Sequence, residues 1–256
     1  MATPGIDLTR WETPAGRALA RAARYGYRLA RRALGRAAPH TVLLLTVAVG
    51  LGTAALMGSG AGEVHEAVDD GDGIAGFDQP VLDGAVQARS ETLTRLVQLY
   101  TDLGGPVGMP VLATAAAVGL AVRWRSWTPV VLTAVTAAGS LLMTTLGKAA
   151  VGRDRPPLAE AIPPFETSYS FPSGHSLNSL AIAGILAYLL VIHQHRRRAR
   201  VATVVLAAAF AVAMGLSRVY LGHHWLTDVV VAWLLALGWL ALVVTGHRLW
   251  ATVRRT

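Results

Sequence analysis

Residues 225–244 read WLTDVVVAWLLALGWLALVV, an apolar run in which Asp228 is the one charged residue. A helix of about 20 mostly apolar residues is long enough to cross the hydrocarbon core of a membrane. Further stretches along the chain have the same character, so the sequence predicts an all-α bundle of six transmembrane helices. The six predicted spans are residues 41–61, 101–122, 127–146, 176–192, 201–217 and 225–244.

The overall composition also indicates a membrane protein. Of the 256 residues, 53% are hydrophobic and 15% are charged, whereas a soluble domain carries about 25% charged residues. The chain has no cysteine, which excludes a disulfide scaffold, a thiolate zinc site and a cysteine nucleophile. The net charge of +8 does not by itself indicate a nucleic-acid partner, because the distribution of the charges matters more than their sum.

Most of the basic residues lie on one side of the predicted bundle. Of 23 lysines and arginines, 17 fall in the N-terminal segment, the second and fourth connections and the C-terminus. Positively charged loops stay in the cytoplasm, so both termini are predicted to be cytoplasmic. Residues 1–40 are then a basic cytoplasmic segment, residues 41–245 the membrane domain, and residues 246–256 a cytoplasmic tail.

Two segments outside the spans have the periodicity of helices. Arginines at positions 17, 21, 24, 28 and 31 would form one basic stripe, which either rests on an anionic inner leaflet or simply sets the topology. Residues 79–100 are predicted to form an outer interfacial helix, with a plain loop as the alternative.

Several basic residues lie on the predicted outer side, close to membrane ends, against the general charge rule: Lys148, Arg153, Arg155 and Arg218. A lysine point charge and a planar arginine fork together suit a phosphoryl group. Ser173 is a candidate N-cap of the fourth span, and Gly174 lets a ligand approach the backbone. The N–H groups of that helix end would attract the same anion.

His224 and Asp228 are four residues apart at the start of the sixth span, so a helix places them on one face. A carboxylate bonded to one ring nitrogen fixes the tautomer and leaves the other nitrogen free to attack. The alternative is a satisfied interfacial pair without chemistry. His175 lies in the first turn of the fourth span, on the same outer face. The set fits phosphoryl transfer through a covalent histidine intermediate, without a metal.

These residues resemble the type 2 phosphatidic acid phosphatase superfamily, which also includes bacterial acid phosphatases and vanadium haloperoxidases. Its three motifs appear in order, with the expected spacing, as Lys148-AAVGRD-Arg155-Pro156, Pro172-Ser173-Gly174-His175 and Ser217-Arg218-VYLGH-His224-WLT-Asp228. The resemblance covers residues 79–245. His223 makes a double histidine where the family varies, and Ala232 stands where many relatives have glycine. Arg153 and Asp154 lie between motif residues and receive no role.

The resemblance implies an integral-membrane lipid phosphatase that needs neither a metal nor another cofactor. His224 would be the nucleophile, Asp228 would orient it, and His175 would protonate the leaving oxygen and then activate water. The phosphate ligands implied by the family are Lys148, Arg155, Ser173, Gly174 and Arg218.

The expected partners are the lipid bilayer and a lipid phosphate, with no nucleic acid. The candidate substrates are undecaprenyl diphosphate, phosphatidylglycerol phosphate and phosphatidate, hydrolysed on the extracytoplasmic side of the cell membrane. Three alternatives stay open at this point. They are a lipid-linked phosphotransferase, a vanadate-dependent haloperoxidase-like enzyme, and a non-catalytic scaffold or transporter.

Overall fold

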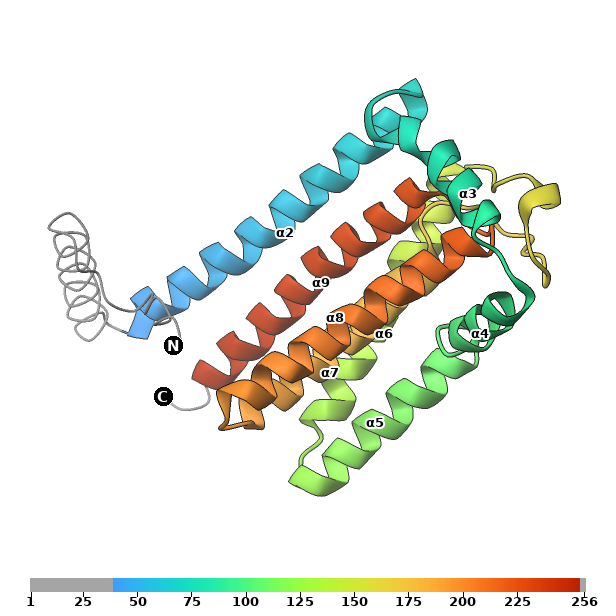
Figure 1. Cartoon of the computed structure of the whole chain (residues 1–256). Helices are drawn as coiled ribbons and strands as arrows, with labels where there is room; N and C mark the ends of the chain where they lie inside the picture. Colours follow the sequence, from blue (N-terminus) through green and yellow to red (C-terminus); the bar gives the residue numbers. More distant parts are fainter. Residues whose placement is uncertain (1–38, 254–256) are drawn as a thin grey trace, which may run out of the picture. The chain divides into compact units, whose positions relative to one another are not determined.

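The computed structural model describes residues 39–253, which form α-helices and two short 3-10 helices and contain no β-strand. The prediction of an all-α protein is confirmed. Residues 1–38, and with them the predicted arginine stripe, lie outside the described residues. The helices are α2 (Pro39–Asp70), α3 (Asp78–Gln87), α4 (Glu91–Asp102), α5 (Gly108–Trp124), α6 (Thr128–Val151), α7 (Gly174–His193), α8 (Arg197–Tyr220) and α9 (Leu226–Val253) (Figure 1).

Five of these helices are long and apolar enough to cross a membrane, namely α2, α6, α7, α8 and α9. The remaining predicted span corresponds to α5, which is apolar but has 17 residues. It is shorter than the sequence suggested because residues 101 and 102 end α4 and the Gly104-Gly105-Pro106 turn follows. Glycine and proline favour turns over helix, so α5 begins only at Gly108.

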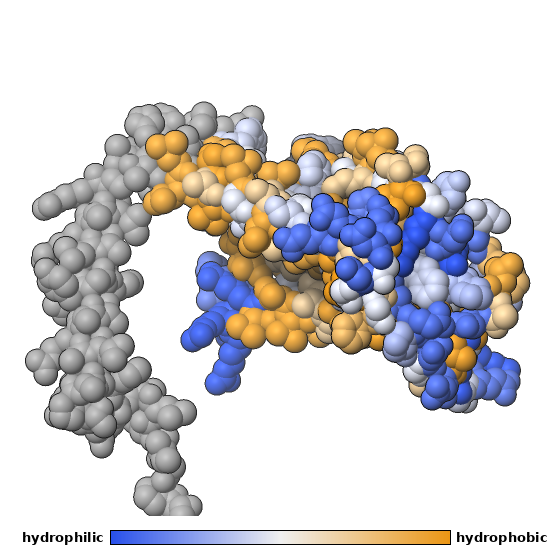
Figure 2. Space-filling model, turned by 90° about the horizontal axis from the view of Figure 1, so that it is seen from above, coloured by the Kyte–Doolittle hydropathy of each residue, from blue (hydrophilic) through white to orange (hydrophobic). Residues whose placement is uncertain are grey.

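Apolar side chains remain uncovered along these helices. Val122 is 74% exposed and Leu206 is 69% exposed. Figure 2 shows hydrophobic residues over much of the visible surface, with hydrophilic residues gathered in patches. An apolar surface of this extent needs a lipid environment rather than water. The chain is therefore a multi-pass membrane protein.

The packing described below concerns residues 49–253, which belong to one compact unit. Helix α7 is central, since it packs against α6, α8 and α9, and its Leu177 and Ile185 are fully buried. Small residues allow close contacts with neighbouring helices. Gly139 of α6 lies against the Trp239 ring, and Gly184 of α7 lies against Leu240. Such small-residue contacts are how membrane helices pack tightly without a hydrophobic driving force between them.

The short helices α3 and α4 lie at the same end of the bundle as the loop between α6 and α7 (Figure 1). The helix predicted over 79–100 is thus two helices. The break falls at Ser90, whose hydroxyl caps α4 by accepting a bond from the Leu93 N–H at 3.3 Å. Arg89 holds the break in place, because its guanidinium donates to the carbonyls of Tyr220 and Glu160.

The helix ends that frame this loop follow the sequence signals. Helix α6 ends at Val151 and is capped by Gly152, which adopts φ +65°, a left-handed conformation that glycine reaches without strain. Helix α7 begins after Ser173, whose side chain accepts a bond from the Ser176 N–H at 3.5 Å. The predicted N-cap is therefore confirmed, and the loop of residues 152–173 is fixed at both ends.

Candidate active site

The three motifs meet at the end of the bundle that carries this loop. Lys148 lies in the last turn of α6, His175 in the first turn of α7 and Arg218 in the last turn of α8. His224 precedes α9, and Asp228 lies in its first turn. Lys148, Gly174, His175, Arg218 and His224 line one cavity of about 1070 Å³. Arg155 and Asp228 do not line the cavity but contact His224, which does, and Ser173 precedes the lining residue Gly174.

His224 and Asp228 form a buried pair. The His224 Nδ1 lies 3.3 Å from an Asp228 carboxylate oxygen, and the two residues are 1% and 0% exposed. Ser170 donates to the same oxygen and lies 3.2 Å from Nδ1. An imidazole whose Nδ1 proton faces a carboxylate keeps a lone pair on Nε2. That Nε2 is 3.4 Å from the Arg155 guanidinium, on the side of the cations.

The environment of His224 keeps its ring neutral. Burial lowers the pKa of His224 well below its usual range, and the charges of Arg155 and Arg218 lower it further. A neutral imidazole is the form that can attack phosphorus.

Asp228 is itself held by a residue to which the sequence assigned no role. The Arg153 Nη1 donates to the second carboxylate oxygen of Asp228 at 2.7 Å, and its Nη2 donates to Asp78 at 2.7 Å. Asp78 also accepts bonds from the N–H and the hydroxyl of Thr227, at 2.9 and 2.6 Å. Arg153 therefore links the Asp228 carboxylate to α3. The position of Arg153 on the predicted outer side was a sequence signal that it belongs to the site. Asp78 gave no such signal, because it lies 75 residues from Arg153 in the sequence.

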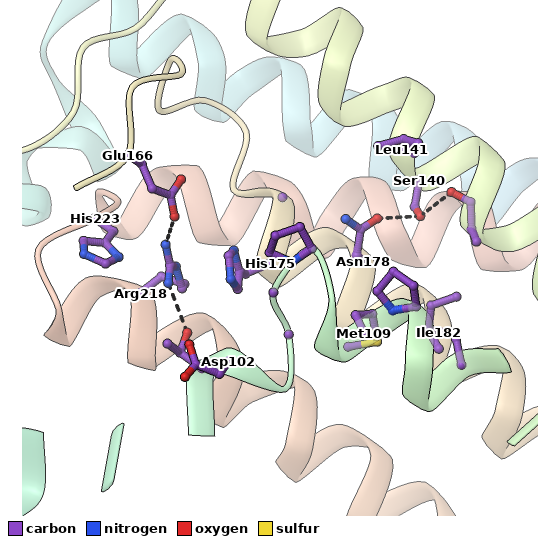
Figure 3. Close-up of a pocket in the computed structure, with 18 of the residues that line it drawn as sticks. Asp102, Met109, Ser140, Leu141, Glu166, His175, Asn178, Ile182, Arg218 and His223 are labelled. Atoms are coloured by element: carbon purple, nitrogen blue, oxygen red, sulfur yellow. Dashed lines mark hydrogen bonds and ion pairs between the residues drawn. The ribbon is translucent and has the colours of Figure 1, made fainter. Parts of the chain in front are cut away.

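Arg155 and Arg218 bind a carboxylate that the sequence also did not indicate. Glu166, in the loop, accepts bonds from Arg155 at 2.7 Å and from Arg218. Burial alone would raise the pKa of Glu166, but the two guanidinium groups outweigh it and bring the pKa to about 2. Glu166 is therefore ionised at neutral pH. Figure 3 shows it above Arg218, on the opposite side from Asp102.

The other predicted site residues are His175, Ser173 and Gly174, and their hydrogen-bond partners differ. The His175 side chain lies beside Arg218 (Figure 3), and no group of the described chain hydrogen-bonds its ring. Ser173 is fully buried, and its oxygen accepts from Ser176, so its own proton is free to donate elsewhere. Gly174 places an N–H at the start of α7, and Thr144 is its nearest neighbour, 3.1 Å from the position of an added Cβ.

The cavity continues from this cluster into the bundle, between α5, α6 and α7. Its deeper walls are mostly apolar, with Met109, Ala117, Leu141 and Ile182 among them. Figure 3 shows Met109, Leu141 and Ile182 at the end of the cavity away from Arg218. A cluster of anion-binding groups that opens into an apolar cavity fits a ligand with a charged head and a hydrocarbon tail.

Comparisons with known proteins agree with this arrangement. Residues 128–251 match the PAP2 superfamily. Phosphatidylglycerophosphatase B of Bacillus subtilis (strain 168) is 31% identical over 162 residues, which cover 61% of this chain and 76% of the relative. The crystal structure of a transmembrane PAP2 type phosphatidylglycerolphosphate phosphatase from Bacillus subtilis superposes with a TM-score of 0.69 at 27% identity, covering 77% of this chain and 96% of the other.

A more distant solved structure shares the fold alone. LpxE of Aquifex aeolicus has a TM-score of 0.52 at 17% identity, covering 66% of this chain and 94% of the other. With the motifs assembled at one end of a membrane bundle and a relative of this identity, the chain belongs to the PAP2 superfamily, as a membrane lipid phosphatase that hydrolyses phosphoric ester bonds.

Proposed function

We propose that this phosphatase works through a phosphohistidine on His224. The observation that carries the proposal is the His224 ring, which is buried and neutral, with Nδ1 on Asp228 and Nε2 beside the cations. In the first step Nε2 attacks phosphorus and the bond between phosphorus and the lipid oxygen breaks. Asp228 stabilises the positive charge that develops on the ring. His175 gives its proton to the leaving oxygen.

The second step regenerates the enzyme. His175, now neutral, takes a proton from water, the resulting hydroxide attacks phosphorus, and the bond between phosphorus and Nε2 breaks to release inorganic phosphate. Throughout, the nonbridging oxygens are bound by the charges of Lys148, Arg155 and Arg218, by the Ser173 hydroxyl and by the Gly174 N–H. Each such donor contributes about 3 kcal/mol of transition-state stabilisation.

The candidate substrates are phosphatidylglycerol phosphate, phosphatidate and undecaprenyl diphosphate. The first has priority because the Bacillus subtilis relative is named for it. The test is phosphate release from each lipid by the purified protein in detergent with a chelator present. Hydrolysis that stops on chelation, or transfer of the phosphoryl group to an added lipid or sugar acceptor without phosphate release, would contradict the proposal. Vanadate should inhibit the enzyme and support no halide oxidation.

For the topology we propose six spans, with α5 as the short one, cytoplasmic termini and an extracytoplasmic active site. The domain limits at residues 40 and 245 follow from the same proposal. It is supported by the basic connections around Arg123 and Arg198, which lie at the helix ends away from the site.

The absence of cysteine makes this topology simple to test. In intact cells, an impermeant maleimide should label Asp72→Cys, in the turn between α2 and α3, and should not label Ser126→Cys, between α5 and α6. After lysis both variants should react. Labelling of Ser126→Cys but not of Asp72→Cys in intact cells would place the site in the cytoplasm.

Glu166 lies between two of the guanidinium groups to which a phosphoryl group would bind, so the two anions compete. We expect Glu166→Gln to lower KM. The negative charge of Glu166 raises the pKa of His224, so its removal lowers that pKa. Because His224 attacks in its neutral form, the acidic limb of kcat/KM should move to lower pH.

The measurement is a pH profile of kcat and KM on one lipid phosphate. The matched control is Glu91→Gln, since Glu91 is exposed on α4 and pairs with the equally exposed Arg95. An acidic limb that moves to higher pH, or a raised KM, would show that Glu166 supports phosphate binding instead of competing with it.

A further inference from the structure

Asn178 occupies a distinctive place in the cavity. It follows His175 by three residues on α7, so both side chains lie on the same helix face, about 4.5 Å apart along the axis. Its Oδ1 lies 2.7 Å from the Ser140 hydroxyl on α6. The Ser140 hydroxyl also lies 3.0 Å from the Ala137 carbonyl, and its one proton is shared between these two acceptors, with the Asn178 oxygen the nearer. The Ser140 contact therefore fixes the orientation of the Asn178 amide.

The other end of this amide is the Nδ2 donor. In the described part of the chain, no group accepts a hydrogen bond from the Asn178 Nδ2. Figure 3 shows that nitrogen on the side of the amide facing His175, away from Ser140. A polar donor in a mostly apolar cavity, next to the predicted acid–base residue and free of protein acceptors, is available for an acceptor on the ligand.

The charges of the cavity lining indicate which kind of ligand oxygen can accept a hydrogen bond from Asn178. The cations in its lining are Lys148 and Arg218, both at the phosphate end. Beyond His175 the polar lining groups are neutral, with Asn178, Ser140, Thr114 and Thr133 as members. The Thr133 hydroxyl is buried and has no hydrogen-bond partner among the described residues. A second phosphate directly after the leaving oxygen would find no cation here, whereas a neutral oxygen would find an amide donor.

We propose that Asn178, held by Ser140, binds the neutral oxygen that follows the leaving oxygen in a glycerol-based phosphomonoester lipid. This inference rests on the proposed function. In phosphatidate the neutral oxygen is an ester carbonyl, separated from the leaving oxygen by the glycerol carbons. In phosphatidylglycerol phosphate it is the hydroxyl of the head group. A polyprenyl diphosphate carries its second phosphate there instead, so the subsite selects glycerol lipids against isoprenoid diphosphates.

The test compares substrates that differ only in this oxygen, using the purified full-length protein in mixed micelles. One pair is diacyl phosphatidate and its dialkyl ether analogue, and the other is phosphatidylglycerol phosphate and its head-group deoxy analogue. A single hydrogen bond of this kind should favour the complete member of at least one pair about fivefold to tenfold in kcat/KM. In Asn178→Leu that ratio should fall to about one.

Gln79→Leu is the matched control, because Gln79 is an exposed amide on α3, and it should keep the wild-type ratio. If Asn178→Leu does not fold, Ser140→Ala tests the proposal in its place. This variant removes the hydrogen bond that orients the Asn178 amide, so the kcat/KM ratio should fall. Wild-type ratios of one for both pairs, or an unchanged ratio in the variant, would overturn this inference. Full turnover by His224→Ala would instead overturn the proposed mechanism, whereas the substrate ratios test the role of Asn178.

Discussion

Replacing His224 by alanine is expected to lower kcat about 10⁶-fold, the scale seen when a nucleophile that acts with its partners is removed. The side chain is buried against Asp228 and Ser170, and its Nδ1 lies 3.3 Å from the Asp228 carboxylate. In the proposed mechanism His175 serves as acid and base, so the attack on phosphorus depends on His224. The measurement is phosphate release per enzyme over hours, with folding checked by thermal unfolding.

His247→Ala provides the control for this variant. His247 contacts Tyr188 at the opposite end of α9, so its loss should leave kcat at the wild-type value. Retention of more than about a tenth of the wild-type kcat in His224→Ala would mean that His224 is not the attacking group, since such a loss is no larger than that of one hydrogen bond.

Replacing Arg153 by methionine should have the second largest effect. Arg153 is the shared counter-charge of Asp78 and Asp228, whose side chains are 6% and 0% exposed. Without it two buried carboxylates lose their counter-charge, which destabilises a protein by about 3 kcal/mol or more. Asp228 would also lose one of the bonds that orient it toward His224. We expect kcat to fall about 100-fold, the upper range for partners that orient a catalytic ligand.

Two further variants separate orientation from simple loss of stability. Arg153→Lys keeps the charge and should restore most of the stability, but not the two-pronged contact and thus only part of kcat. Arg95→Met is the control, since the Arg95 pair with Glu91 lies on the surface and contributes little. A kcat in Arg153→Met equal to the wild type, measured below its unfolding temperature, would show that Asp228 does not need this partner.

The sequence predicted the helices well where a single segment determines them. The apolar runs marked the middles of α2, α6, α7, α8 and α9, and Ser173 marked the start of α7. The prediction was less accurate for α5, because the hydropathy of residues 101–107 is compatible with a span although Gly104 and Pro106 make a turn there. It also missed the break at Ser90, where an N-cap interrupts one continuous helical period.

The active-site residues also divide into those that the sequence predicted and those that it did not. Residues that belong to ordered motifs could be named from their spacing, because the spacing fixes their helix ends. Asp78 and Glu166 could not, since each meets its arginine partner through the folded chain, and Glu166 comes from an irregular loop with no periodicity. Asn178 was hidden for another reason. A lone asparagine in an apolar helix acquires meaning only when its neighbour across the helix interface, here Ser140, is known.

The most direct test of a covalent histidine is to trap it. His175→Ala should still transfer the phosphoryl group from an aryl phosphate, whose leaving group needs no acid, but should be slow to activate water. We predict a burst of one aryl alcohol per enzyme and a phosphoryl group that maps to His224, stable in base and lost in acid. Steady turnover without a burst, or a label on any other residue, would contradict the mechanism.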